Sequence, residues 1–129
     1  MFVDTNILVR HLTGDPPDQA ARAGASLATA DDLILPDVVV AEVVHVLESV
    51  YGAPRDLVAL SLRAIVTFPA VRTSDRDLLL RAIEVYEYDR LDFGEAYLVA
   101  SAERSGVGAI LSFDRSIDLV PTVRRIEPE

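Results

Sequence analysis

Short apolar segments alternate with longer helical segments along the whole chain, and this alternation limits the fold more than any other feature. Short strands that alternate with helices are typical of α/β proteins with a mostly parallel sheet. The 129 residues are expected to form a single domain, residues 1–129. The expected strands lie at 1–4, 33–35, 71–73, 109–113 and 123–125.

Six helices are predicted between these strands, and proline or glycine residues separate several of them. The 74–88 helix is expected to begin with a capping box formed by Ser74 and Asp77. Gly106 is expected to end the last helix. The predicted helices span 5–12, 17–30, 36–50, 55–68, 74–88 and 92–105.

The composition excludes several kinds of site. The chain has no cysteine and only 2 histidines, which excludes disulfides and thiolate metal sites and argues against a His-rich zinc site. The remaining ligands are carboxylate oxygens, which suit Mg²⁺ or Mn²⁺. A net charge of −9 argues against a general nucleic-acid binder but not against an enzyme with a metal-neutralised acidic site.

The expected location is the cytoplasm. The longest apolar run, VVVAEVVHVL, is interrupted by Glu42 and is too short to span a bilayer, so no membrane association is expected. The N-terminus has no signal-like pattern, and the absence of cysteine fits a reducing compartment.

Two aspartates directly follow apolar strand segments. Asp4 follows Phe2 and Val3, and Asp114 follows the segment AILSF. In parallel α/β folds, ligands bind at the carboxyl ends of strands. Each aspartate also has an ordinary explanation as a helix cap or a turn residue.

Glu42 lies within an almost wholly apolar helix. In one interpretation it belongs to a polar stripe with His45 and Ser49 that faces water. In the other it faces a shared acidic pocket, because an unpaired buried carboxylate is costly and needs a partner.

Asp92 and Glu95 have the spacing of a capping box, with both carboxylates on one side of a helix start. Capping and metal binding are compatible for one member of the pair. The following residues, AYLVASA, are small and apolar, so the helix is expected to be buried.

Taken together, the carboxylates point to a cation. Asp4, Glu42, Glu95 and Asp114, with Asp92 beside them, would each lie at a strand end or on a helix of one small domain. Like charges brought close together repel one another, and a divalent ion makes such a cluster favourable near neutral pH. Asp4 is therefore predicted to be a metal ligand.

Four segments in order resemble one family. MFVDTNILVR, AEVVHVL, DFGEAYLVASAE and LSFDRSIDLV are similar to motifs of PIN-domain ribonucleases, in particular the VapC-type toxins of toxin–antitoxin pairs. The resemblance covers the whole chain in length and motif order. It implies a three-layer PIN-like α/β sandwich, in which helices flank a short, mostly parallel central sheet.

The resemblance also implies the site residues. The catalytic carboxylates would be Asp4, Glu42, Glu95 and Asp114. The family has Asp at the position of Glu95, so either Glu95 or Asp92 would complete the metal ligands. Thr5, Asn6 and Ser112 would orient these ligands by hydrogen bonding.

The implied activity is a Mg²⁺- or Mn²⁺-dependent endoribonuclease. One or two ions would activate a water that attacks the RNA phosphodiester, with Glu42 or Glu95 orienting or deprotonating it. The candidate phosphate contacts are Arg10, His11, Arg72 and Arg115.

The residues also bear on two alternative functions. A phosphotransferase of the haloacid-dehalogenase type needs a second Asp two residues after the first, where this chain has Asn6. A catalytically inactive PIN-like module that binds protein or RNA is the other alternative, because Glu95 stands where the family has Asp.

The resemblance further implies partners. These are an RNA substrate, a VapB-like antitoxin and a second copy of the chain in a homodimer. The apolar helices at 38–50 and 57–68 are expected to form the walls of the antitoxin groove.

Overall fold

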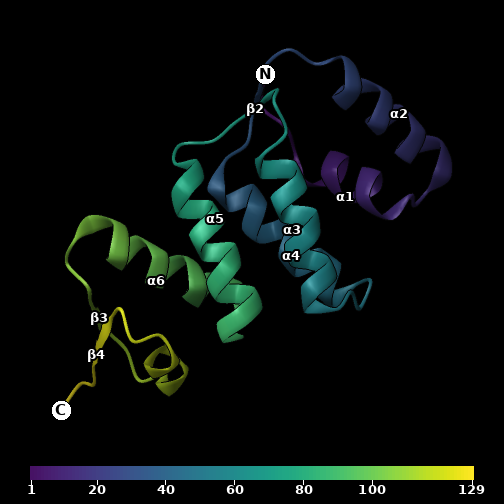
Figure 1. Cartoon of the computed structure of the whole chain (residues 1–129). Coiled ribbons are helices and arrows are strands. Elements are labelled where there is room, and N and C mark those ends of the chain that lie inside the picture. Colours follow the sequence, from purple (N-terminus) through teal and green to yellow (C-terminus); the bar gives the residue numbers. More distant parts are fainter. The chain divides into compact units, whose positions relative to one another are not determined.

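The computed structural model describes residues 1–129 as helices joined by very short strands (Figure 1). The chain divides into two compact units, Met1–Arg76 and Asp77–Glu129. Each unit contains one pair of parallel strands. The expected α/β class and parallel pairing are confirmed, whereas the single domain over 1–129 stays a prediction.

The first unit contains four helices and two strands. The chain enters α2, α3 and α4 through Pro16, Pro36 and Pro54, each with an extended backbone. Proline suits a helix start because the first N–H groups have no partner within the helix. The elements are α1 (Thr5–Thr13), α2 (Pro17–Thr29), β1 (Leu33–Ile34), α3 (Asp37–Ser49), α4 (Arg55–Val66) and β2 (Val71–Arg72).

The strands of the first unit are shorter than expected. In β1 and β2, Leu33 is paired with Val71 and Ile34 with Arg72. The predicted first strand is reduced to one parallel bridge between Phe2 and Ile34. Backbone hydrogen bonds from Val3 to Ile34 and from Ile34 to Met1 still align the N-terminus with β1.

The core of the first unit consists mainly of aliphatic side chains. Helix α1 packs against α2 and α3, and α3 packs against α4. Burying these side chains supplies the main stabilisation and fixes the start of α1 relative to α3. The fully buried members with the largest volumes are Leu35, Val40, Val43, Val44, Val58, Leu62 and Val66.

The second unit begins with α5 (Arg76–Glu84), which starts on the last residue of the first unit and continues into the π-helical turn η1 (Val85–Asp89). Arg90, with φ of 64°, reverses the chain before α6 (Phe93–Ser105). Tyr86 in η1 packs edge-on against Phe93 in α6, with ring centroids 6.1 Å apart. The remaining elements are β3 (Ala109–Leu111), the 3₁₀ turn η2 (Arg115–Leu119) and β4 (Arg124–Ile126).

The start of α5 differs from the prediction. The helix begins at Arg76, so Ser74 lies outside it and the predicted capping box with Asp77 is wrong. The Ser74 hydroxyl instead donates to the Asp37 carboxylate at 3.4 Å. The predicted end of α6 is confirmed, because Gly106 adopts φ of 78° as its C-terminal cap.

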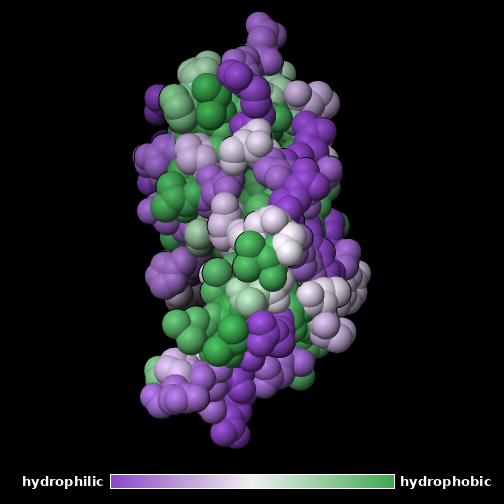
Figure 2. Space-filling view, turned by 90° about the vertical axis from the view of Figure 1, so that its left-hand side faces the viewer, coloured by the Kyte–Doolittle hydropathy of each residue, from purple (hydrophilic) through white to green (hydrophobic).

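Large apolar side chains remain exposed in both units. Figure 2 shows apolar patches between hydrophilic side chains on one face of the molecule. None of the helices combines the length and the apolar character that crossing a bilayer requires. The exposed large apolar side chains include Val38, Leu57 and Leu60 in the first unit and Leu98, Leu111, Phe113 and Leu119 in the second.

Candidate functional site

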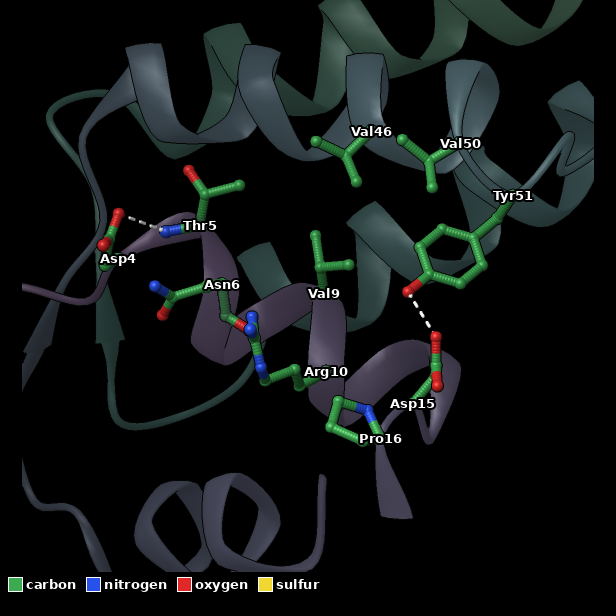
Figure 3. Close-up of a pocket in the computed structure, with 10 residues that line it drawn as sticks. All are labelled: Asp4, Thr5, Asn6, Val9, Arg10, Asp15, Pro16, Val46, Val50 and Tyr51. Atoms are coloured by element: carbon green, nitrogen blue, oxygen red, sulfur yellow. Dashed lines mark hydrogen bonds between the residues drawn. The ribbon is translucent and has the colours of Figure 1, made fainter. Parts of the chain in front are cut away.

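Asp4 caps helix α1. Its Oδ1 accepts a hydrogen bond from the Thr5 backbone N–H at 2.7 Å, and its side chain is exposed (Figure 3). A carboxylate at a helix N-terminus is stabilised by the unpaired N–H groups and the helix dipole. The capping role is therefore confirmed, and the second carboxylate oxygen can still bind a ligand.

Thr5 connects the start of α1 to Glu42 on α3. The buried Thr5 side chain donates from its hydroxyl to Glu42 Oε2 at 2.9 Å. Glu42 is exposed, as the polar-stripe interpretation expected, and His45 contacts Ser49 at 3.4 Å on the same helix. Glu42 nevertheless approaches the start of α1, so Thr5 bridges Asp4 and Glu42 within the first unit.

In the second unit, Asp92 and Asp114 are both caps. Asp92 Oδ1 accepts from the Glu95 backbone N–H at 2.8 Å at the start of α6. Asp114 Oδ1 accepts from the Ser116 backbone N–H at 2.8 Å at the start of η2. Ser112 supports this turn, because its hydroxyl accepts from the Asp114 backbone N–H at 2.9 Å.

The side chains of Glu95 and Asp114 are hydrogen-bonded to each other. This bond to Asp114 is the main cause that raises the pKa of Glu95 to about 7, and partial burial and the nearby charge of Asp92 raise it further. The same bond, together with Ser116, lowers the pKa of Asp114 to about 2. The pair therefore holds one shared proton well above the pH at which an ordinary carboxyl group loses it.

Ser116 was not among the residues predicted from the sequence. Its hydroxyl donates to Glu95 Oε2 at 3.3 Å, while its backbone N–H binds Asp114. The backbone contact of Ser116 could have been predicted, because an Asp that caps a turn commonly accepts a hydrogen bond from the N–H two residues later. No local pattern indicates the contact with Glu95, which lies 21 residues earlier.

The structure separates the roles of Asp92 and Glu95. Asp92 uses one oxygen to cap α6 and acts on Glu95 through its charge, whereas the Glu95 side chain contacts Asp114 directly. Which of the two binds a metal stays a prediction.

The side-chain atoms that could bind a metal are of the type that a hard divalent ion prefers. All are oxygens, and Glu95 and Asp114 lie close enough for a cation between them to relieve the repulsion of two carboxylates. The structure contains no group of three or more His, Cys, Asp or Glu side chains arranged to hold a metal ion. It describes two acidic sets, Asp4 with Glu42 in the first unit and Asp92, Glu95 and Asp114 in the second.

A cavity of about 440 Å³ lies beside Asp4 in the first unit. Asn6 lines it together with Asp4 and Thr5, as Figure 3 shows. Tyr51 and Asp15, which the sequence did not single out, form the far side, where the Tyr51 hydroxyl donates to Asp15 Oδ2 at 2.9 Å.

Comparison with known proteins gives one family. The sequence profile of the PIN domain matches residues 1–122, a range that includes all the predicted site residues of both units. No curated protein matches the chain.

Proposed function

The chain belongs to the PIN domain family over residues 1–122, and from that premise we propose that it is a divalent-metal-dependent endoribonuclease. PIN domains are typically nucleases. The observation that supports the proposal most strongly is the direct contact between the Glu95 and Asp114 side chains, because two carboxylates in contact form a site that a cation can occupy.

Asp4, Glu42, Glu95 and Asp114 are proposed as the catalytic carboxylates, with Asp92 as a further candidate ligand. Nucleases with this domain generally use divalent metals, and Mg²⁺ or Mn²⁺, when bound, supplies a water of lowered pKa and neutralises phosphate charge. Thr5 holds Glu42 by its hydroxyl, and Ser116 and Ser112 hold Glu95 and the Asp114 backbone.

Glu42 is proposed to orient or deprotonate the attacking water, because Glu95 and Asp114 would hold the ion. The Thr5 hydroxyl, which donates to Glu42 Oε2 at 2.9 Å, would keep this carboxylate in position. The pKa of about 7 at Glu95 applies to the metal-free protein, and Glu95 would bind the ion in its ionised form.

Variants of the two acidic sets test this function. Asp4→Asn and Asp114→Asn are each expected to reduce RNA cleavage by at least about a hundredfold with the fold retained, as judged by circular dichroism. Glu48→Gln, on the exposed face of α3, is the control and should cleave as the wild type does. If the Asp4→Asn variant cleaves RNA at the wild-type rate, Asp4 is not a catalytic residue.

We further propose that the protein is a VapC-type toxin that acts in the cytoplasm as a homodimer and is inhibited by a VapB-like antitoxin. The exposed side chains of Val38, Leu57 and Leu60 on α3 and α4 support an apolar docking surface for such a partner. The test is co-expression with the adjacent reading frame, if that frame encodes a small DNA-binding protein. The two proteins are expected to purify together.

An inactive binding module is the second candidate. It is favoured by Glu95, which stands at the position where the family has Asp. A metal that binds only the folded protein must raise the melting temperature. An unchanged melting temperature in millimolar Mg²⁺ or Mn²⁺ would favour the binding module.

A further inference from the structure

Apolar and aromatic side chains line part of the cavity beside Asp4. They are Val9 of α1, Val46 of α3, and Val50 and Tyr51, which follow the end of α3. Figure 3 shows the Tyr51 side chain extending from this end toward Asp15. The volume of about 440 Å³ lies within the usual range for small-ligand sites, about 300–1,000 Å³.

The Tyr51 ring is held in place but accessible. Its hydroxyl donates to Asp15 Oδ2 at 2.9 Å, which ties the end of α3 to the loop between α1 and α2. The residue is 39% exposed, so part of the ring remains open to solvent. An aromatic ring fixed in advance costs little entropy on binding and offers a stacking surface for a nucleic-acid base.

Two arginines are available to a phosphate, one in this cavity and the other in a neighbouring cavity. Arg10 lines it and bonds the Gln19 side chain and, at 3.5 Å, the Asn6 carbonyl, neither of which is a carboxylate. Arg22 lines a neighbouring cavity of about 280 Å³, which Arg10, Asn6 and Gln19 also line. Neither arginine forms an ion pair with a carboxylate, whereas Arg72 is paired with Asp32.

We propose that this cavity binds one nucleotide of a single-stranded RNA, with the base stacked on Tyr51 and a phosphate on Arg10, which also lines the neighbouring cavity of Arg22. The inference rests on the proposed nuclease function and assigns the residues that would hold its RNA substrate. A base inside a duplex is covered on both faces by its neighbours, so an internal nucleotide bound here must be unstacked. The nucleotide lies next to Asp4, where the proposed cleavage takes place.

A fluorescence titration tests the site without requiring catalysis. The probe is a ten-nucleotide RNA that contains 2-aminopurine, whose emission falls when it stacks, in a buffer with EDTA and with a gel showing that the RNA stays intact. The wild type is expected to bind it and quench it. Tyr51→Leu should bind about tenfold more weakly and lose the quenching, whereas Tyr51→Phe, which keeps the ring without the Asp15 bond, should bind within about threefold of the wild type.

Two further variants separate charge from stacking. Arg10→Gln should weaken binding about fivefold and reduce the slope of log affinity against log salt by about one. Tyr88→Leu, which removes a 70% exposed tyrosine in the second unit, is the matched control and should bind as the wild type does. Melting curves check that each variant is folded.

Several outcomes would overturn the nucleotide site: wild-type binding without quenching, no binding at all, or Tyr51→Leu binding within twofold of the wild type. Failure of the nuclease proposal gives a different result. A wild type that quenches the probe but never cleaves RNA in Mg²⁺ or Mn²⁺ would support the nucleotide site and contradict the nuclease.

Discussion

Glu95 and Asp114 form one hydrogen-bonded carboxyl pair across the second unit, although 18 residues separate them in the sequence. The bond raises the pKa of Glu95 to about 7 and lowers that of Asp114. At neutral pH the pair is therefore partly protonated, and a divalent ion has to displace this proton in order to bind both carboxylates. This competition between proton and metal gives the first prediction.

Metal binding should release a proton. Isothermal titration with Mn²⁺ near pH 6, in buffers with different heats of ionisation, is expected to show release of about one proton per protein, falling toward zero well above pH 7. The physical reason is that the Glu95 carboxyl group must ionise before it can bind the ion. Glu95→Gln is the control, and equal proton release by this variant would contradict the assignment.

Removal of the Glu95 charge should stabilise the metal-free protein at high pH. Because its pKa is raised in the folded state, its stabilising contribution is fully present below about 4.5 and is lost as the pH rises through about 7. After allowance for solvent screening, Glu95→Gln is expected to gain about 1 kcal/mol, or a few degrees in melting temperature, near pH 8.

The pH dependence provides the control for this stability measurement. The gain of Glu95→Gln should disappear near pH 5, where the wild-type carboxyl group is largely protonated. The lowered pKa of Asp114 affects stability only below about pH 4, outside this window. A variant that is less stable than the wild type at both pH values would show that the raised pKa is wrong.

The Thr5 hydroxyl should matter for activity more than for stability. Thr5→Val keeps the shape of the side chain but removes the donor that holds Glu42 Oε2 at 2.9 Å. Loss of such a supporting hydrogen bond typically costs about 10–100-fold in metal affinity or activity. Thr29→Val, which removes a hydroxyl bonded only to backbone carbonyls of α2, should leave cleavage unchanged. Equal rates for the two variants would exclude a positioning role for Thr5.

The ion pair of Arg81 and Glu103 should stabilise the second unit independently of the acidic residues. The guanidinium donates from Nε to Oε1 at 2.8 Å and from NH2 to Oε2 at 3.0 Å, and the pKa of Glu103 is lowered mainly by these bonds. Glu103→Gln is expected to cost about 1–2 kcal/mol in urea unfolding at neutral pH. The more exposed Glu84→Gln should cost less than about 0.5 kcal/mol.

The sign of the pH effect at Glu103 can be checked in the same experiment. A lowered pKa gives stability that is present above about 4.5 and lost as the pH falls further. The difference between Glu103→Gln and the wild type should therefore shrink in acid. A constant difference down to the lowest pH reached would contradict the charge-based explanation.

Local patterns predicted the capping residues correctly. Asp4, Asp92 and Asp114 each accept a backbone hydrogen bond within the next three residues, so the information lies in a few consecutive positions. The positive φ of Gly106 is likewise a local property of a helix end. The helices were predicted well for the same reason.

Contacts between distant residues could not be predicted in this way. Ser74 donates to Asp37 instead of capping α5, and Tyr51 reaches Asp15, in each case over more than thirty residues. In place of the predicted first strand there is one parallel bridge, between Phe2 and Ile34. Such contacts depend on how the helices pack, which single-sequence periodicity does not specify.

Metal rescue of RNA cleavage tests the central claim most directly. The purified protein should be inactive toward a labelled single-stranded RNA in EDTA and should regain cleavage when Mg²⁺ or Mn²⁺ is added in excess. Asp4→Asn, prepared in parallel, should stay inactive throughout, which controls for a contaminating nuclease. Equal wild-type cleavage with and without EDTA, or none in either metal, would contradict a metal-dependent ribonuclease.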